Sequence, residues 1–319
     1  MPPPRLVDLQ VNGYAGVDFN DAALTAAGLD HALAAMRTDG VAVCLPTLIT
    51  APGDVLAARF AALDRAVAAS ALGRSMVPGY HLEGPFLSPE PGYAGCHPPD
   101  AMVPPDPALV ARLEAPLGRP ILLITLAPER PGAIQLIGWA RARGKLVAIG
   151  HSAATPGQIV AAADAGARLS THLGNALFHT QPKFANPMLA QLAEDRLSAS
   201  FIADGRHIPP FALKVLLRAK GAARSILVSD ATAAAAAPPG RYRFAGMAIA
   251  HGEDGIVRLD GTDTLAGSSL RLGQAVRNLV TWGLASTAEA ERMAVDNPAA
   301  LLAPAVAAHG GCWPPADAG

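Results

Sequence analysis

Short apolar runs rich in Val, Ile and Leu alternate along the chain with longer stretches rich in Ala and Leu. The runs have the length of buried strands, and the stretches have the length and composition of helices. The predicted strands are residues 6–12, 41–48, 77–84, 120–128, 145–151, 168–173, 197–205 and 225–230. This regular alternation predicts a parallel sheet that is covered by helices.

The number of strand and helix units decides between two parallel folds. Several predicted helices begin near Asp, Pro or Asn and end at Gly, as helix caps do. They are residues 30–40, 54–70, 106–118, 134–144, 156–167, 187–196, 210–221 and 268–283. Eight units favour an α/β fold of the TIM (β/α)8 barrel type over a doubly wound sheet. We expect the barrel domain over residues 1–303, a β-hairpin insertion at about 241–267 around Asp254, and an irregular tail over 304–319.

Composition restricts the class of protein. Of the 319 residues, 51% are hydrophobic and 16% are charged, and the formal net charge is -1. Such a chain can bury one large core but has no bulk attraction for nucleic acid or an anionic membrane. Its cysteines form no CxxC pair, and the sequence shows neither a signal peptide nor an apolar span. We therefore expect a cytoplasmic protein that acts on a small molecule.

Four polar residues follow predicted strands three, five, six and eight, namely Glu83, His151, His172 and Asp230. Each of them alone could be a cap or a buried hydrogen-bonded group. Together they lie at the carboxyl ends of barrel strands, the face on which TIM-barrel active sites are built. Two imidazoles and one carboxylate can hold a metal and leave a coordination position open, which is typical of a catalytic site. Asp230 is then available as a general base.

Neighbouring residues refine this prediction. Gln10 and Asn12 occupy positions i and i+2 of the first strand, where a second metal requires two histidines, so the pattern indicates one metal. His81 shares a strand face with Glu83 and could also be a ligand, but a packing or supporting role is favoured. His97 lies in a Gly- and Pro-rich loop, where it can cover a bound ligand or simply face solvent.

Two loops, after predicted strands six and seven, carry polar and cationic groups. The first is long for a connection between a strand and a helix, which indicates function. It offers Asn175 and the backbone of Ala176 to a polar ligand, and Lys183 to a negative group. The second loop supplies Arg206 and His207, with the alternative that such loop cations are only solvated.

Several segments resemble, in order, the motifs of the N-acetylglucosamine-6-phosphate deacetylase family of the amidohydrolase superfamily. They are VDLQVNGYAGVDF, HLEGPFLSP, ITLAPE, GHSAAT, THLGNA, IADGRH, LVSDAT, LAGSSLRLGQAVRNLV and NPAALL. HLEGPF, THLGNA and IADGRH together are highly specific. The resemblance implies a metal-dependent TIM barrel that converts N-acetylglucosamine 6-phosphate to glucosamine 6-phosphate and acetate.

The resemblance also implies roles in the metal centre. Glu83, His151 and His172 match the ligands of one divalent metal, with zinc first and iron or another divalent metal as alternatives. Gln10 matches the glutamine of the single-metal branch. Asp230 matches the residue that takes a proton from the nucleophilic water and passes it to the leaving amine.

Further matches concern the substrate. His97 matches a histidine that contacts the carbonyl region, and Asn175 and Ala176 match contacts to the sugar phosphate. His207 matches a histidine that the neighbouring subunit of a homodimer offers to the phosphate. Family members commonly carry Arg where this chain has Lys183, so a point charge replaces a bidentate phosphate contact.

Two further departures leave the substrate open. Relatives begin with a small β-domain and return to it after the barrel, whereas this chain starts almost at the first barrel strand, so we expect the accessory β-sandwich domain to be missing. The segment EPGYAGCH before His97 also differs from the corresponding loop of many relatives. The alternatives are a deacylase of an unphosphorylated or different N-acyl substrate, and a non-catalytic ligand-binding relative.

Overall fold

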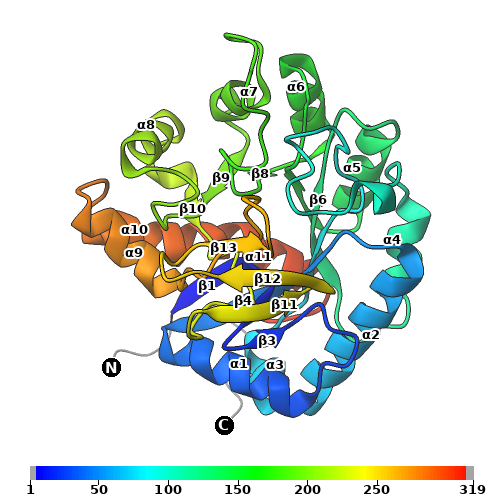
Figure 1. Cartoon of the computed structure of the whole chain (residues 1–319). Coiled ribbons are helices and arrows are strands. Elements are labelled where there is room, and N and C mark those ends of the chain that lie inside the picture. The colour runs from blue at the N-terminus through cyan, green and yellow to red at the C-terminus, as the bar shows by residue number, and fades with distance from the viewer. Residues whose placement is uncertain (1–4, 314–319) are drawn as a thin grey trace.

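The computed structural model describes residues 5–313 (Figure 1). Eight parallel strands form a barrel. Around the barrel the strands lie in chain order: β1 (Leu6–Val11), β4 (Val41–Ile49), β5 (Tyr80–Glu83), β6 (Ile121–Leu126), β7 (Leu146–Ile149), β8 (Leu169–Ser170), β9 (Ser198–Phe201) and β10 (Ser225–Leu227). The ring closes beyond β10, where the amide of Asp230 donates to the carbonyl of Gln10 at 3.0 Å. Close by, the amide of Asn12 donates to the carbonyl of Ala231 at 2.7 Å. The predicted TIM barrel is confirmed.

Helices occupy the connections between strands and surround the barrel (Figure 1). They are α1 (Ala26–Thr38), α2 (Gly53–Ala69), α3 (Ala71–Met76), α4 (Pro107–Glu114), α5 (Ala133–Ala142), α6 (Pro156–Ala165), α7 (Pro187–Ala193), α8 (Pro210–Lys220), α9 (Leu272–Thr281), α10 (Thr287–Ala294) and α11 (Asp296–Ala308). Side-chain caps define the N-termini of several helices. Thr155, for example, forms a capping box with Gln158 at the start of α6. Every predicted helix is present, with its ends shifted by a few residues. Among the described residues, no helix is both long and apolar enough to cross a membrane.

Three helices go beyond the sequence prediction: α3, α10 and α11. The sequence does contain a start signal for α10, because Ser286 and Glu289 form a capping box there. Helix α11 extends to Ala308 with Pro304 inside it, so the predicted irregular tail is wrong up to that residue. Proline removes one intrahelical hydrogen bond, but its alanine-rich neighbours have the highest helix propensity. The end of the predicted tail, residues 314–319, lies outside the described residues.

The strands are buried on both faces. Every residue of β6 and β7 is buried, as expected for parallel strands between a filled barrel interior and a layer of helices. One continuous apolar core joins the strands to the inner faces of the helices. This packed frame fixes the points at which the strands end, and therefore the positions of the residues that follow them.

The predicted insertion is a three-stranded antiparallel sheet, not a single hairpin. Its strands are β11 (Gly240–Phe244), β12 (Met247–His251) and β13 (Val257–Leu259). The predicted turn near Asp254 does join β12 to β13, but a second turn joins β11 to β12. That turn places Ala245 and Gly246 at φ 52° and 86°, the positive angles that a tight hairpin requires. Alanine at such a position is an unusual turn residue, which is why the sequence pattern misses it.

Candidate metal and active site

The four polar residues predicted at strand ends meet at one end of the barrel. Glu83 is the last residue of β5, whereas His151, His172 and Asp230 follow β7, β8 and β10 within three residues. The backbones of these three have φ values of 51°, 30° and 48°. Such left-handed conformations are uncommon for residues other than glycine and persist only where the surrounding structure enforces them. Their coincidence at one barrel end singles out this end as a functional site.

Three ligand atoms form a small triangle at the centre of the site. Glu83 Oε1 lies 3.0 Å from His172 Nε2 and 3.5 Å from His151 Nε2, and the two imidazole nitrogens are 3.2 Å apart. A tetrahedral zinc ion with bonds of about 2.0 Å separates its ligands by about 3.3 Å. All three residues are buried. The donor set therefore fits one divalent metal ion.

The orientation of the His151 ring supports this fit. Its Nδ1 donates to the carbonyl of Tyr93 at 2.8 Å, which leaves Nε2 with a lone pair that faces the triangle. Burial raises the pKa of Glu83, but the adjacent His151 and His172 side chains outweigh burial and hold that pKa well below the usual value. Burial lowers the pKa of His172, whereas the neighbouring Glu83 raises it by more. The site thus favours an anionic Glu83 beside a positive charge.

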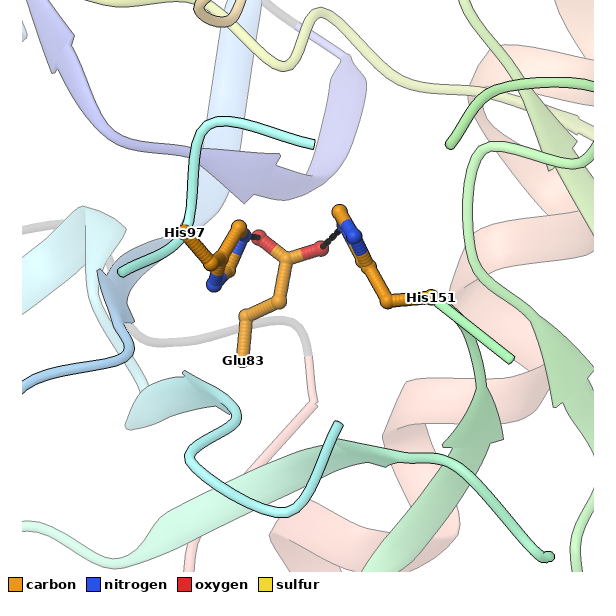
Figure 2. A group of neighbouring side chains, drawn as sticks. All are labelled: Glu83, His97 and His151. Atoms are coloured by element: carbon orange, nitrogen blue, oxygen red, sulfur yellow. Dashed lines mark ion pairs between the residues drawn. The ribbon is translucent and has the colours of Figure 1, made fainter. Parts of the chain in front are cut away.

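His97 lies on the other side of Glu83 from His151 (Figure 2). Its Nε2 is 3.7 Å from Glu83 Oε2, and its Nδ1 is 2.8 Å from the hydroxyl of Thr50. Glu83, His97 and His151 bring their ligand atoms within 4.8 Å of one another, so His97 is also close enough to be considered as a ligand. The shorter distances of 3.0 and 3.2 Å favour His172 as the third member. Burial and the neighbouring His151 lower the pKa of His97 to about 3, which keeps its ring neutral.

Two amides hold the Asp230 carboxylate beside the triangle. Asn12 Nδ2 donates to Asp230 Oδ1 at 2.8 Å, and Gln10 Nε2 donates to the same oxygen at 3.2 Å and to Glu83 Oε1 at 2.9 Å. Burial and the nearby Glu83 raise the pKa of Asp230 to about 6. Sequence reasoning used Gln10 and Asn12 only to argue against a second metal. Their donor role appears only when β1 is placed beside β10.

His81 is held by other residues. Its Nδ1 lies 3.2 Å from the hydroxyl of Thr47, and its Nε2 lies 2.8 Å from the hydroxyl of Thr125. Burial lowers the pKa of His81 to about 4, so this fully buried ring is neutral. Both ring nitrogens are engaged inside the barrel, which agrees with the favoured supporting role.

A cavity of about 630 Å³ opens above the triangle. Four predicted substrate contacts line it together with the residues of the triangle and Asp230, namely His97, Asn175, Ala176 and His207. His207 lies in the cavity of its own chain, where Asp204 Oδ2 accepts from its Nδ1 at 2.7 Å. Lys183 is exposed outside the lining, with its Nζ 5.4 Å from the ring centre of Phe184.

A histidine that lines the cavity was not predicted from the sequence. No sequence pattern assigned a role to His179, an exposed residue that lines the cavity together with Asn175 and Ala176. It lies in the long loop after β8, and the length of that loop was the available signal.

The chain is similar to known sugar phosphate deacetylases, although no protein-family model matches it. The N-acetylgalactosamine-6-phosphate deacetylase of Escherichia coli O157:H7 is 37% identical over 305 residues, covering 94% of this chain and 77% of that protein. The N-acetylglucosamine-6-phosphate deacetylase of Bacillus subtilis (strain 168) is 31% identical over 302 residues, covering 94% of this chain and 74% of that protein.

The chain is also similar to a solved deacetylase structure. An aspartate-to-alanine variant of N-acetyl-D-glucosamine-6-phosphate deacetylase from Mycobacterium smegmatis, in complex with N-acetyl-D-glucosamine 6-phosphate, superposes with a TM-score of 0.85 at 33% identity. The superposition covers 94% of this chain and 77% of that chain. The relatives are thus longer than the chain described here. By its sequence identity and its barrel, this chain belongs to the N-acetylhexosamine 6-phosphate deacetylase family of amidohydrolases.

Proposed function

We propose that this protein removes the acetyl group from N-acetylglucosamine 6-phosphate, with N-acetylgalactosamine 6-phosphate as the second candidate. The observation that carries the proposal is the buried triangle of Glu83, His151 and His172 beside the Asp230 carboxylate. The relatives named above act on one or the other of these two sugars by name, so family membership supports both candidates.

Glu83, His151 and His172 hold one divalent ion in this proposal, with zinc first and iron or another divalent metal as alternatives. When bound, the ion lowers the pKa of water and polarises the acetamide carbonyl. Glu83 contributes negative charge, and the His151 ring is fixed by its hydrogen bond to Tyr93. A ligand-binding relative without catalytic activity does not require such a metal site together with a second carboxylate, that of Asp230, beside it.

Asp230 transfers the proton. It accepts a proton from the attacking water while the water oxygen bonds to the acetyl carbon. It then delivers this proton to the sugar nitrogen as the C–N bond breaks, so that acetate and a free amine leave. Gln10 and Asn12 both donate to Oδ1, which fixes the carboxylate and leaves Oδ2 for this transfer.

His97 faces the substrate carbonyl in this proposal. The hydroxyl of Thr50, at 2.8 Å, can donate to Nδ1, which leaves the proton of the neutral ring on Nε2. That N–H can then donate to the carbonyl oxygen. Burial keeps the ring neutral, so it acts as a hydrogen-bond donor without competing for the proton that Asp230 moves.

The phosphate lies toward Asn175, the backbone of Ala176 and His207, which line the cavity. The decisive test compares kcat/KM for N-acetylglucosamine 6-phosphate, N-acetylgalactosamine 6-phosphate and free N-acetylglucosamine. Hydrogen bonds to a charged group contribute about 1.5–3 kcal/mol each, so we expect the phosphorylated sugar to be preferred by at least about 100-fold. Equal values for the phosphorylated and free sugars contradict the phosphate assignment and favour a deacylase of unphosphorylated substrates.

Lys183 gives a separate test of the phosphate site. If its side chain reaches the phosphate, as predicted from the sequence, Lys183→Met raises KM for the phosphorylated sugar by about tenfold and leaves kcat nearly unchanged. The matched control is Lys214→Met, which removes another exposed lysine from α8. Identical kinetics of the two variants remove Lys183 from the binding site. The homodimer implied by the resemblance stays a prediction, and light scattering of the purified protein measures it.

A further inference from the structure

The cavity has two chemically different walls. Asn175, His179 and His207, from the loops after β8 and β9, supply the polar wall. Ile49, Cys96, Phe244 and Leu265 supply apolar surface to the same cavity. Since the strands follow chain order around an eight-membered ring, β4, which carries Ile49, lies across the barrel from β8. The triangle and Asp230 line the same cavity.

The apolar wall adjoins the reacting centre. Ile49, the last residue of β4, pairs in register with Glu83 on β5. The next residue, Thr50, lies 2.8 Å from His97, and Cys96 directly precedes that histidine. Cys96 packs against a buried cluster that contains Ile49 and Phe244. An apolar surface therefore begins at the metal ligand Glu83 and continues into the inserted sheet.

The wall is also held in place. Ala245, the residue after Phe244, is bound through both of its backbone polar groups. Its N–H donates to Asp18 Oδ2 at 2.7 Å, and its carbonyl accepts from the Arg59 guanidinium at 2.8 Å. These contacts connect the turn between β11 and β12 to α2 and to the short hairpin of β2 (Gly13–Tyr14) and β3 (Val17–Asp18). Phe244 therefore has little freedom to retreat from a larger ligand.

We infer that the apolar wall is the acyl subsite and that it limits the substrate to short N-acyl groups. This inference rests on the proposed function. In an N-acyl amino sugar the sugar and the acyl chain extend from opposite sides of the amide. With the sugar phosphate on the polar wall, the acetyl methyl points to Ile49, Cys96, Phe244 and Leu265. A fixed, close-packed apolar wall accepts a methyl group but cannot move to accommodate added methylene groups.

The experiment measures kcat/KM for N-acetyl- and N-propionylglucosamine 6-phosphate with the wild-type protein, three variants of the apolar wall and one control variant. One methylene group in an apolar pocket changes selectivity by about 10- to 200-fold. Phe244→Ala and Leu265→Ala are each expected to raise the propionyl-to-acetyl ratio by at least about tenfold. Cys96→Leu fills the subsite, so it is expected to lower the ratio below that of the wild type. Leu265 is only partly buried, so its variant tests the inference even if Phe244→Ala does not fold.

Tyr242→Ala is the matched control. Tyr242 lies on β11 two residues before Phe244 and packs against the same cluster, but it does not line the cavity. Its loss perturbs the inserted sheet without enlarging the subsite, so the ratio should stay at the wild-type value. A wild-type ratio in Leu265→Ala and in folded Phe244→Ala overturns the inference, as does an equal rise in the control. Failure of the wild type to deacetylate any N-acetylhexosamine phosphate rejects the proposed function instead.

Discussion

Replacing Asp230 with asparagine is expected to lower kcat by about 100- to 10,000-fold, the range that general acid–base catalysis contributes. Asparagine has nearly the same shape as aspartate and keeps an oxygen that accepts from Gln10 and Asn12. The site should therefore hold its geometry and its metal while it loses the group that accepts and returns the proton. Steady-state kinetics with metal analysis of the same sample measures both properties.

The matched control is Asp8→Asn. Asp8 is a second buried aspartate inside the barrel, where its Oδ1 accepts from the amide of Ser229 at 3.1 Å, and it does not line the cavity. Burial raises the pKa of Asp8 to about 7, so a neutral amide is a close substitute for this side chain. We expect this variant to keep most of its activity. If Asp230→Asn retains more than a tenth of the wild-type kcat, Asp230 is not the proton-transfer group. If Asp8→Asn lowers kcat by the same factor as Asp230→Asn, the loss is not specific to Asp230 and the assignment is rejected as well.

The sequence was sufficient for the barrel and for the residues at the strand ends. A buried parallel strand has a local sequence signal, which is a short apolar run followed by a polar residue. In the runs that end at Glu83 and His151 this signal spans only a few consecutive residues. Once the strands close into a barrel, their carboxyl ends meet, so residues far apart in sequence come together without further information. The prediction needed only the element order, and the order was correct.

Contacts that depend on exact backbone paths could not be predicted. The carbonyl of Tyr93 orients His151 because the loop after β5 folds back over β7, and nothing in the letters around Tyr93 marks this. The amides of Gln10 and Asn12 reach Asp230 because β1 and β10 close the ring at one particular register. The turn between β11 and β12 has alanine at position 245, where a positive φ usually requires glycine, asparagine or aspartate. Contacts of Ala245 with Asp18 and Arg59 hold this conformation. Long-range contacts decide such features, and local propensity does not.

Replacing His172 with alanine is expected to abolish tight metal binding, whereas His97→Ala should bind one equivalent of metal and lose activity. His172 Nε2 lies 3.0 Å from Glu83 Oε1 and 3.2 Å from His151 Nε2, separations that a shared ion produces. His97 Nε2 is 3.7 Å from the other oxygen of Glu83, and its second nitrogen contacts Thr50. Metal analysis after dialysis, followed by titration with zinc, distinguishes the two variants directly.

Thermal unfolding gives a second readout, because a ligand that binds only the folded state stabilises it by RT ln(1 + [L]/Kd). At a free zinc concentration of 1,000 times Kd this amounts to about 4.1 kcal/mol, so added zinc should raise the Tm of the wild type and of His97→Ala. It should leave the Tm of His172→Ala nearly unchanged. His81→Ala is the matched control, since it removes a buried histidine two residues from Glu83 whose ring nitrogens contact Thr47 and Thr125. That variant should unfold at a lower temperature in the absence of metal and still gain stability from zinc.

The opposite pattern, with metal lost in His97→Ala and retained in His172→Ala, makes Glu83, His97 and His151 the ligand set. It also leaves His172 as the hydrogen-bonding partner of Glu83.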